Sequence, residues 1–177
     1  EQIHRTIGMS LPEILAALTE PSVHPRSEEF ERWFMERAEQ VVVERAVVFP
    51  PTGPTLKILE DQGWSLGIVS TKTRRRIVAI LQRERLEGHF KVVIGGEDVA
   101  GHKPDPRGLL LAAAQLGCAA SEVVYVGDSV IDAEVAQRGG MSFVAVLSGV
   151  TPRAAFKDFD SVAVIETLNE LPLVLAR

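Results

Sequence analysis

The sequence predicts an α/β protein whose parallel sheet is covered by helices on both faces. Short runs rich in Val and Ile alternate with helical segments over residues 54–177, and strands of this composition are typical of a parallel sheet buried on both sides. Turn residues, among them Gly63 and the pair Gly139-Gly140, separate these runs. At 177 residues the chain is long enough for one sizeable core and a small accessory element.

Residues 1–48 are predicted to be helical and to form a separate, smaller domain. Apolar residues at 11, 14, 15 and 18 follow the spacing of an amphipathic helix, and Ser27 is expected to cap a second helix that carries Phe30 and Phe34. The stretch 49–54, Phe-Pro-Pro-Thr-Gly-Pro, reads as a stiff turn. We therefore place the domain boundary between residues 1–48 and 49–177.

The second part is predicted to alternate regularly between helices and strands. Helices are expected at about 54–62, 73–86, 105–116 and 131–138, strands at 66–70, 91–94, 123–126, 142–146 and 162–164, and a short helix at the end. In open α/β sheets, ligands bind at the carboxyl ends of the strands. Chemistry is therefore sought in the residues that directly follow these strands.

Residues 123–132, Val-Val-Tyr-Val-Gly-Asp-Ser-Val-Ile-Asp, place two carboxylates at such an end. Asp128 and Asp132 are four residues apart, and no Lys or Arg lies in this segment. Carboxylate oxygens suit a hard cation such as Mg²⁺, which takes oxygen ligands both from carboxylates and from a substrate phosphate. The alternative is a strand-to-helix turn in which Asp128 or Ser129 caps the following helix.

Two further segments carry polar groups at loop-to-helix junctions. Lys103 stands in Gly-His-Lys-Pro-Asp-Pro, residues 101–106, just before an apolar helical run, where its ammonium would be held at one end of the helix. Ser70 and Thr71 end the strand predicted at 66–70. The alternatives are an ordinary solvated lysine in a turn and a hydroxyl that caps the next helix.

The order hydroxyl, lysine, Gly-Asp-Ser-x-x-x-Asp resembles the haloacid dehalogenase (HAD) superfamily, specifically its phosphoglycolate phosphatase-like branch. Ser70 matches the second motif of the superfamily, Lys103 the third, and Asp128 with Asp132 the fourth. The resemblance covers roughly residues 5–163. It implies a Rossmann-like parallel sheet with a small helical cap.

The first motif of the superfamily, Asp-x-Asp-Gly-Thr, does not occur in this sequence. In the family that motif supplies the nucleophilic aspartate and the general acid/base aspartate, and its strand is central in the sheet. Residues 1–48 resemble part of a cap domain. We therefore expect an N-terminally truncated chain whose nucleophile lies upstream of Glu1 and which is inactive as written.

The resemblance implies a Mg²⁺-dependent phosphatase of a small phosphorylated metabolite such as phosphoglycolate, acting through an aspartyl-phosphate. Ser70 and the backbone N–H of Thr71 would bind phosphoryl oxygens, Lys103 would neutralise the phosphate, Asp128 would hold Mg²⁺, and Asp132 would support that metal shell directly or through water. In the haloacid dehalogenases the fourth motif resembles Ser-Ser-x-x-x-Asp, and in the sugar phosphomutases it resembles Glu-Asp-Ser. This chain has Gly-Asp-Ser-x-x-x-Asp instead. The alternative is a non-catalytic relative that serves as a binding or interaction module.

Composition excludes several other classes. A net charge of −5 disfavours nucleic-acid binding, and no apolar run approaches the ~20 residues of a membrane helix. A single cysteine, Cys118, forms no internal disulfide and fits the reducing cytoplasm. The expected partner is a small phosphorylated metabolite, and we expect no binding to nucleic acid or membranes. The sequence leaves open whether the protein forms a homodimer.

Overall fold

The structure is a computed structural model that describes residues 43–101 and 103–176, together with residues 20, 29, 32–34, 37 and 41. The chain divides into two compact units, Glu1–Ala46 and Val47–Arg177. In the first unit, residues 29, 32–34, 37, 41 and 43–45 are helical. The amphipathic helix expected around residues 11–18 lies outside the described residues.

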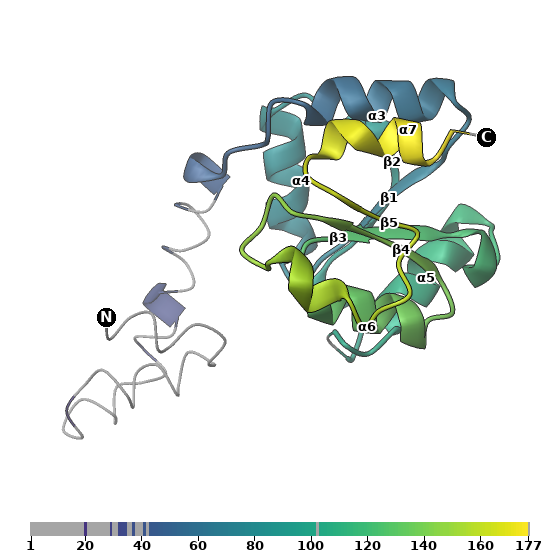
Figure 1. The fold of residues 1–177 in the computed structure, drawn as a ribbon. Coiled ribbons are helices and arrows are strands. Elements are labelled where there is room, and N and C mark those ends of the chain that lie inside the picture. The colour runs from purple at the N-terminus through teal and green to yellow at the C-terminus, as the bar shows by residue number, and fades with distance from the viewer. Residues whose placement is uncertain are drawn as a thin grey trace. The chain divides into compact units, whose positions relative to one another are not determined.

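Helices and strands alternate along the second unit, as the sequence predicts (Figure 1). The strands are β1 (Leu66–Val69), β2 (Phe90–Ile94), β3 (Val124–Gly127), β4 (Ser142–Val146) and β5 (Ala163–Ile165). The α-helices are α3 (Thr52–Asp61), α4 (Arg74–Arg83), α5 (Arg107–Leu116), α6 (Val130–Arg138) and α7 (Leu171–Val174). Short 3-10 helices include η4 (Gly96–Asp98) and η6 (Arg153–Phe156). Each strand and helix predicted for residues 49–177 is thus confirmed, with ends shifted by a few residues.

The strands form two parallel sheets rather than one. β1 pairs with β2, with Gly67 opposite Val92, and a second sheet has the order β3-β4-β5, with Val124 opposite Ser142. In the described part of the chain, one edge of β1 and one edge of β3 therefore have no strand partner. The α/β class is confirmed.

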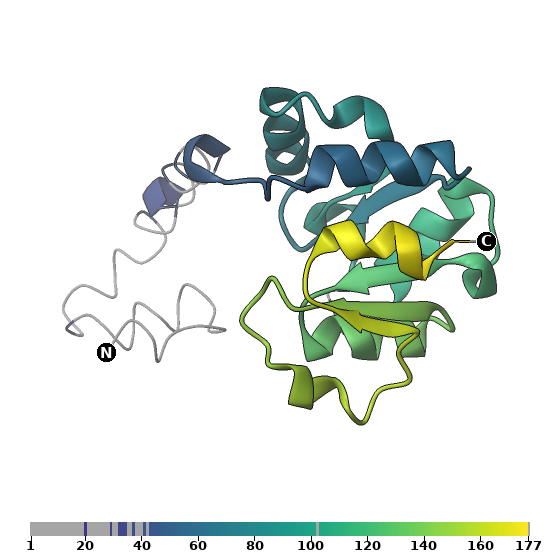
Figure 2. The ribbon, with the colours of Figure 1, turned by 45° about the horizontal axis from the view of Figure 1, so that its top comes forward.

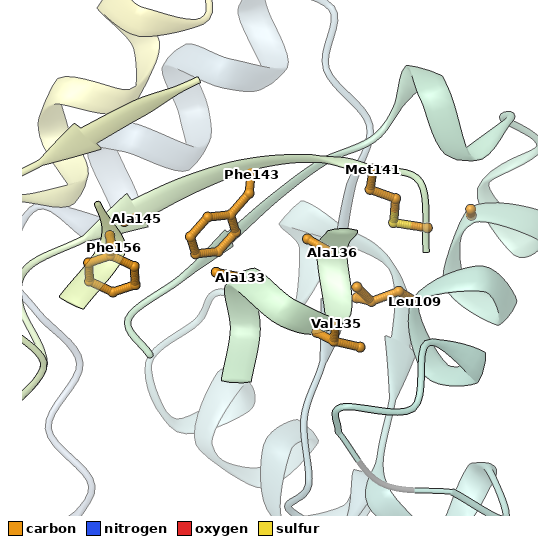
Figure 3. Close-up of a cluster of buried hydrophobic side chains, with 9 residues drawn as sticks. Leu109, Ala133, Val135, Ala136, Met141, Phe143, Ala145 and Phe156 are labelled. Atoms are coloured by element: carbon orange, nitrogen blue, oxygen red, sulfur yellow. The ribbon is translucent and has the colours of Figure 1, made fainter. Parts of the chain in front are cut away.

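Helices cover both faces of the three-stranded sheet. Successive side chains of β4 point to opposite faces, so they contribute to two different apolar clusters. Phe143 and Ala145 point to one cluster, where they meet Val135 and Ala136 of α6 (Figure 3). Val144 and Val146 belong to the other cluster, which contains residues of α3, β5 and α7. Figure 2 shows α3 and α7 side by side, away from α5 and α6.

The two sheets share this second cluster. Leu66 of β1 packs against it, and so do Val124 and Val126 of β3. All three side chains are only partly buried, whereas Val144 of β4 is completely buried. No helix in the described part of the chain is long and apolar enough to cross a membrane.

Candidate active site

The side chains that the sequence singles out lie at the carboxyl ends of the strands. Ser70 and Thr71 directly follow β1, and Lys103 lies in the loop between η4 and α5. All three line one hollow, together with Gly95, Gly96, Gly101, Asp105 and several apolar residues. The structure therefore brings the hydroxyl segment and the lysine together, although 31 residues separate Thr71 from Lys103 in the sequence.

Ser70 is fixed by both its backbone and its side chain. Its backbone N donates to the carbonyl of Ile94 at 3.0 Å, and its Oγ accepts from the backbone N of Lys72 at 3.2 Å. A hydroxyl that accepts in this way still has its O–H to donate. The capping alternative is not what is observed, because α4 begins after Thr73 and no side chain of the N-cap residue bonds to its backbone.

Two acidic side chains anchor the loop that follows Ser70 and Thr71. Glu97 Oε1 accepts from the backbone N of Arg74 at 2.9 Å, and therefore binds the first N–H of α4. Asp98 Oδ2 accepts from the backbone N of Gly95 at 2.6 Å and from Arg74 Nε at 3.1 Å. The hydrogen bond from Gly95, with help from Arg74, lowers the pKa of Asp98. Sequence reasoning missed this anchor, since it joins residues more than twenty positions apart.

Gly95 and Gly96 allow the two loops to approach each other closely. A Cβ on Gly96 would lie 2.6 Å from the carbonyl oxygen of Thr71, and a Cβ on Gly95 would lie 2.3 Å from the backbone N of Arg74. Both neighbours are backbone atoms, which cannot move aside as a flexible side chain can. The glycine pair thus lets the loop after β2 pack closely against the loop after β1 at the edge of the hollow.

Lys103 is held by two acceptors. Its Nζ donates to Asp132 Oδ1 at 2.7 Å and to the hydroxyl of Tyr125, and it lies 5.0 Å from the centre of the Tyr125 ring. The side chain of Lys103 is 18% exposed, so its ammonium is largely withdrawn from water. The lysine is therefore not the solvated turn residue of the alternative interpretation.

Asp132 receives four hydrogen bonds on its two carboxylate oxygens. Lys103 and Tyr125 donate to Oδ1, while the backbone N and the Oγ of Ser129 donate to Oδ2. A carboxylate offers about four lone-pair positions, so these donors occupy its acceptor capacity. Burial raises the pKa of Asp132, but the bonds from Lys103 and Ser129 outweigh it and hold the pKa below its usual value.

Gly127 makes room for Asp132, and Ser129 fixes its position at the start of α6. A Cβ on Gly127 would lie 2.3 Å from Cβ of Asp132, so only glycine leaves space for the aspartate at this point. Ser129 is the N-cap of α6 and accepts from the backbone N of Asp132 at 3.2 Å, as the capping alternative predicts. Capping and site formation are therefore compatible here.

Tyr125 is the site residue that sequence reasoning missed. Burial, followed by the negative charge of Asp132, raises the pKa of Tyr125, which keeps the hydroxyl protonated and able to donate to Asp132. The available signal was the presence of one tyrosine in an otherwise apolar strand, since a buried tyrosine hydroxyl usually has a polar partner.

Asp128 differs from Asp132 in being exposed and free. Within residues 43–101 and 103–176, no donor bonds to its carboxylate, and the loop after β4 passes close beside it. A Cβ on Gly149 would lie 2.1 Å from Asp128 Oδ2. The chemistry of Asp128 therefore fits a hard cation, whereas Asp132 could bind one directly only by giving up one of its donors. Among the described residues, no cluster of three or more His, Cys, Asp or Glu side chains is placed to hold a metal ion.

The hollow holds no free carboxylate that could attack phosphorus, as far as the structure describes the chain. Asp105 lines it, but hydrogen bonds from the side chain and backbone of Arg107 lower the pKa of Asp105 to about 2 and occupy its oxygens. Asp158 and Asp160 are exposed in the loop between η6 and β5, and neither lines the hollow.

This chain is similar to known proteins of one family. A model of haloacid dehalogenase-like hydrolases matches residues 1–146. The phosphoglycolate phosphatase of Salmonella typhimurium is 34% identical over 142 residues, which is 80% of this chain and 55% of that protein. That of Escherichia coli strain K12 is 32% identical over the same shares. The chain thus spans about half the length of the curated relatives it matches.

Solved structures agree with this family. A haloacid dehalogenase-like hydrolase from Bacteroides fragilis is 40% identical, with a TM-score of 0.82 over 96% of this chain and 81% of that chain. A β-phosphoglucomutase from Thermotoga maritima is 25% identical, with a TM-score of 0.79 over 99% of this chain and 82% of that chain.

Proposed function

The chain belongs to the haloacid dehalogenase-like hydrolase family, and on that premise we propose that it forms part of a Mg²⁺-dependent phosphatase. Its substrate would be a small phosphorylated metabolite, of which phosphoglycolate is the example suggested by the names of its relatives. The observation that carries the proposal is one hollow lined by Ser70, Thr71 and Lys103. Hydroxyl, backbone N–H and ammonium groups are the donors that bind phosphoryl oxygens.

Each of these residues would have a distinct task. The Oγ of Ser70 accepts from the backbone N of Lys72, and this leaves its O–H to donate to a phosphoryl oxygen. Lys103 would place a positive charge beside the phosphate in a partly dehydrated site, where charge stabilisation is worth more than in water. Together they would orient the phosphoryl group and stabilise the charge that develops on it.

Asp128 would hold the metal ion, because its carboxylate is exposed and accepts from no described donor. Mg²⁺ would supply neutralisation of phosphate charge. Asp132 would act mainly through Lys103, since its own acceptor positions are occupied.

The aspartates that attack phosphorus and transfer the proton would lie outside these 177 residues. The family resemblance implies both groups, with an aspartyl-phosphate intermediate, on a strand central in the sheet. Support comes from the edges of β1 and β3, which have no strand partner in the described part of the chain and lie against one apolar cluster. A strand between them would bring its carboxyl end beside Ser70 and Asp128.

Two other activities fit less well. Sugar phosphomutases have a fourth motif that resembles Glu-Asp-Ser, whereas this chain has Gly127-Asp128-Ser129. The difference favours hydrolysis over phosphoryl transfer between sugars. A non-catalytic binding module is favoured by one observation, the lack of a free carboxylate among the described residues that line the hollow. We also propose that the protein works in the cytoplasm and that the metabolite is its partner. Whether it forms a homodimer is to be measured.

The experiment uses the protein extended to its complete reading frame. We expect Mg²⁺-dependent release of phosphate from phosphoglycolate or p-nitrophenyl phosphate, and Asp128→Asn should raise the Mg²⁺ concentration needed for half-maximal rate at least tenfold. Glu122→Gln, on an exposed residue before β3, is the matched control and should leave that concentration unchanged. Unchanged Mg²⁺ dependence in Asp128→Asn would refute the metal assignment, and an inactive extended protein would favour the binding module.

A further inference from the structure

Tyr125 lies beneath the lysine of the site and contacts it in two ways. Its hydroxyl accepts from Lys103 Nζ, and its ring lies 5.0 Å from the same nitrogen. The hydroxyl also donates to Asp132 Oδ1 at 3.1 Å. Three polar groups, from the loop before α5, from β3 and from α6, thus form a closed set of hydrogen bonds. Each member bonds to both of the others.

The number of donors determines where the lysine can bind a ligand. An ammonium has three N–H groups, and two of those of Lys103 are directed to Asp132 and Tyr125. The third is the one that remains for the hollow, which Lys103 lines together with Ser70 and Thr71. Without the tyrosine hydroxyl, a second N–H would lose its acceptor, and the ammonium could rotate about its bond to Asp132.

The position of Tyr125 in β3 also suits this role. Residues two apart in a strand point to the same face, so Tyr125 and Gly127 face the same side of the sheet. Gly127 leaves the space that Asp132 occupies, and Tyr125 fills the space beside it. Its ring is further held by Phe143 on the neighbouring strand, with 6.4 Å between ring centres.

We propose that Tyr125 is a positioning residue, which fixes Lys103 so that the third N–H of its ammonium faces a phosphate group in the hollow. The inference rests on the proposed function for the identity of the ligand. It assigns a role to a residue that matches none of the motif positions named for the family resemblance. Tyr125→Phe removes the hydroxyl and keeps the ring, and is therefore the variant that isolates this role.

The first test observes the ammonium itself, independently of any ligand. In ¹H–¹⁵N NMR spectra of lysine side chains, Lys103 should give a slowly exchanging NH₃⁺ signal, assigned by its loss in Lys103→Met. Tyr125→Phe should speed its exchange with water about tenfold, as expected for one lost hydrogen bond to a charged group. The signal of Lys57, an exposed residue paired with Asp61, should not change. An unchanged Lys103 signal in Tyr125→Phe would overturn the inference.

The second test separates positioning from general stabilisation. Tyr125→Phe should weaken binding of inorganic phosphate about tenfold in the otherwise unchanged chain, and have no effect in the Lys103→Met background. Ser142→Ala, which removes a hydroxyl from the residue opposite Val124, should change phosphate binding in neither background. A merely structural tyrosine would lower affinity equally in both backgrounds, and that result would overturn the inference.

The two tests also distinguish this inference from the proposed function. If the unchanged chain binds no phosphate, the proposed phosphate site is wrong. The NH₃⁺ signal of Lys103 then decides alone whether Tyr125 fixes the lysine: faster exchange in Tyr125→Phe supports it, and an unchanged signal refutes it.

Discussion

Lys103 donates a hydrogen bond to Asp132 across 29 positions of sequence, with 2.7 Å between Nζ and Oδ1. The bond connects the loop before α5 with the first turn of α6. The side chains of the two residues are 18% and 9% exposed, so the pair is partly withdrawn from water. Removing either partner leaves the other charge poorly compensated, which usually destabilises a protein strongly.

The pair should make stability depend on pH in the acid range. Because the pKa of Asp132 is lower in the folded chain than in the unfolded one, its charge stabilises the fold above the unfolded pKa of about 3.9. That stabilisation should be lost as the pH falls through the lower, folded pKa. Asp132→Asn should therefore flatten the fall in the free energy of unfolding between about pH 5 and pH 2, measured in urea. An equally steep fall in this variant would contradict the assignment.

If the extended protein is the phosphatase proposed above, Lys103→Met should reduce its turnover about 100-fold or more, the size of effect seen when one electrostatic donor is lost from a site. Its charge, rather than its bulk, is what matters. Lys91→Met provides the control, because Lys91 is exposed and, among the residues that the structure describes, donates only to Ser65. Turnover of Lys103→Met close to that of the unchanged protein would mean that Lys103 has no catalytic role.

Glu97→Ala should loosen the loop that carries Ser70 and Thr71. The variant leaves the first N–H of α4 without its acceptor, which should cost about 1 kcal/mol of the free energy of unfolding. Amide exchange at Arg74 should become faster in parallel. Glu84→Ala, at the other end of α4, removes an ion pair with Arg83 near the surface and should cost less. Equal costs for both variants would argue against the anchor.

Gly127→Ala should destabilise the fold by about 1–3 kcal/mol, because its Cβ would lie 2.3 Å from that of Asp132 and force the aspartate to move. Gly88→Ala is the matched control, since nothing lies within 4 Å of a Cβ at that position. Chemical denaturation of both variants measures the difference. If Gly127→Ala were as stable as Gly88→Ala, Asp132 would not be packed against β3 as described.

The open edges of β1 and β3 should be visible in hydrogen exchange. Strand β4 has a partner on both sides, whereas β1 and β3 have one each among the described strands. Amides of β4 should therefore exchange more slowly than those of β1 and β3. In the extended protein, β1 and β3 should gain protection, because we propose that a further strand joins them. Unchanged exchange of both strands in the extended protein would contradict that strand.

The elements of the second unit could be predicted because their signals are local. Apolar periodicity and turn residues lie within each segment, so the residue range of β4 was predicted without error. The division into two sheets could not be derived from such local signals. It depends on which strands meet, and the sequence pattern predicted a single parallel sheet.

The candidate site was predicted in its parts but not in its connections. Sequence spacing treats Asp128 and Asp132 alike, as two carboxylates after one strand. The structure separates them, because Lys103 and Tyr125 reach Asp132 from elsewhere and leave Asp128 free. The bond from Arg74 to Glu97 was missed for the same reason. Such pairings depend on how distant loops pack, which no local pattern records.

We propose that these 177 residues bind a phosphate group through Lys103 but do not cleave it. A single ³¹P NMR experiment tests it, with p-nitrophenyl phosphate, Mg²⁺ and the purified chain of 19.3 kDa. We predict that the ester signal broadens with the unchanged chain and not with Lys103→Met, and that no inorganic phosphate accumulates. Steady Mg²⁺-dependent growth of the inorganic phosphate signal, or no broadening with the unchanged chain, would contradict the account.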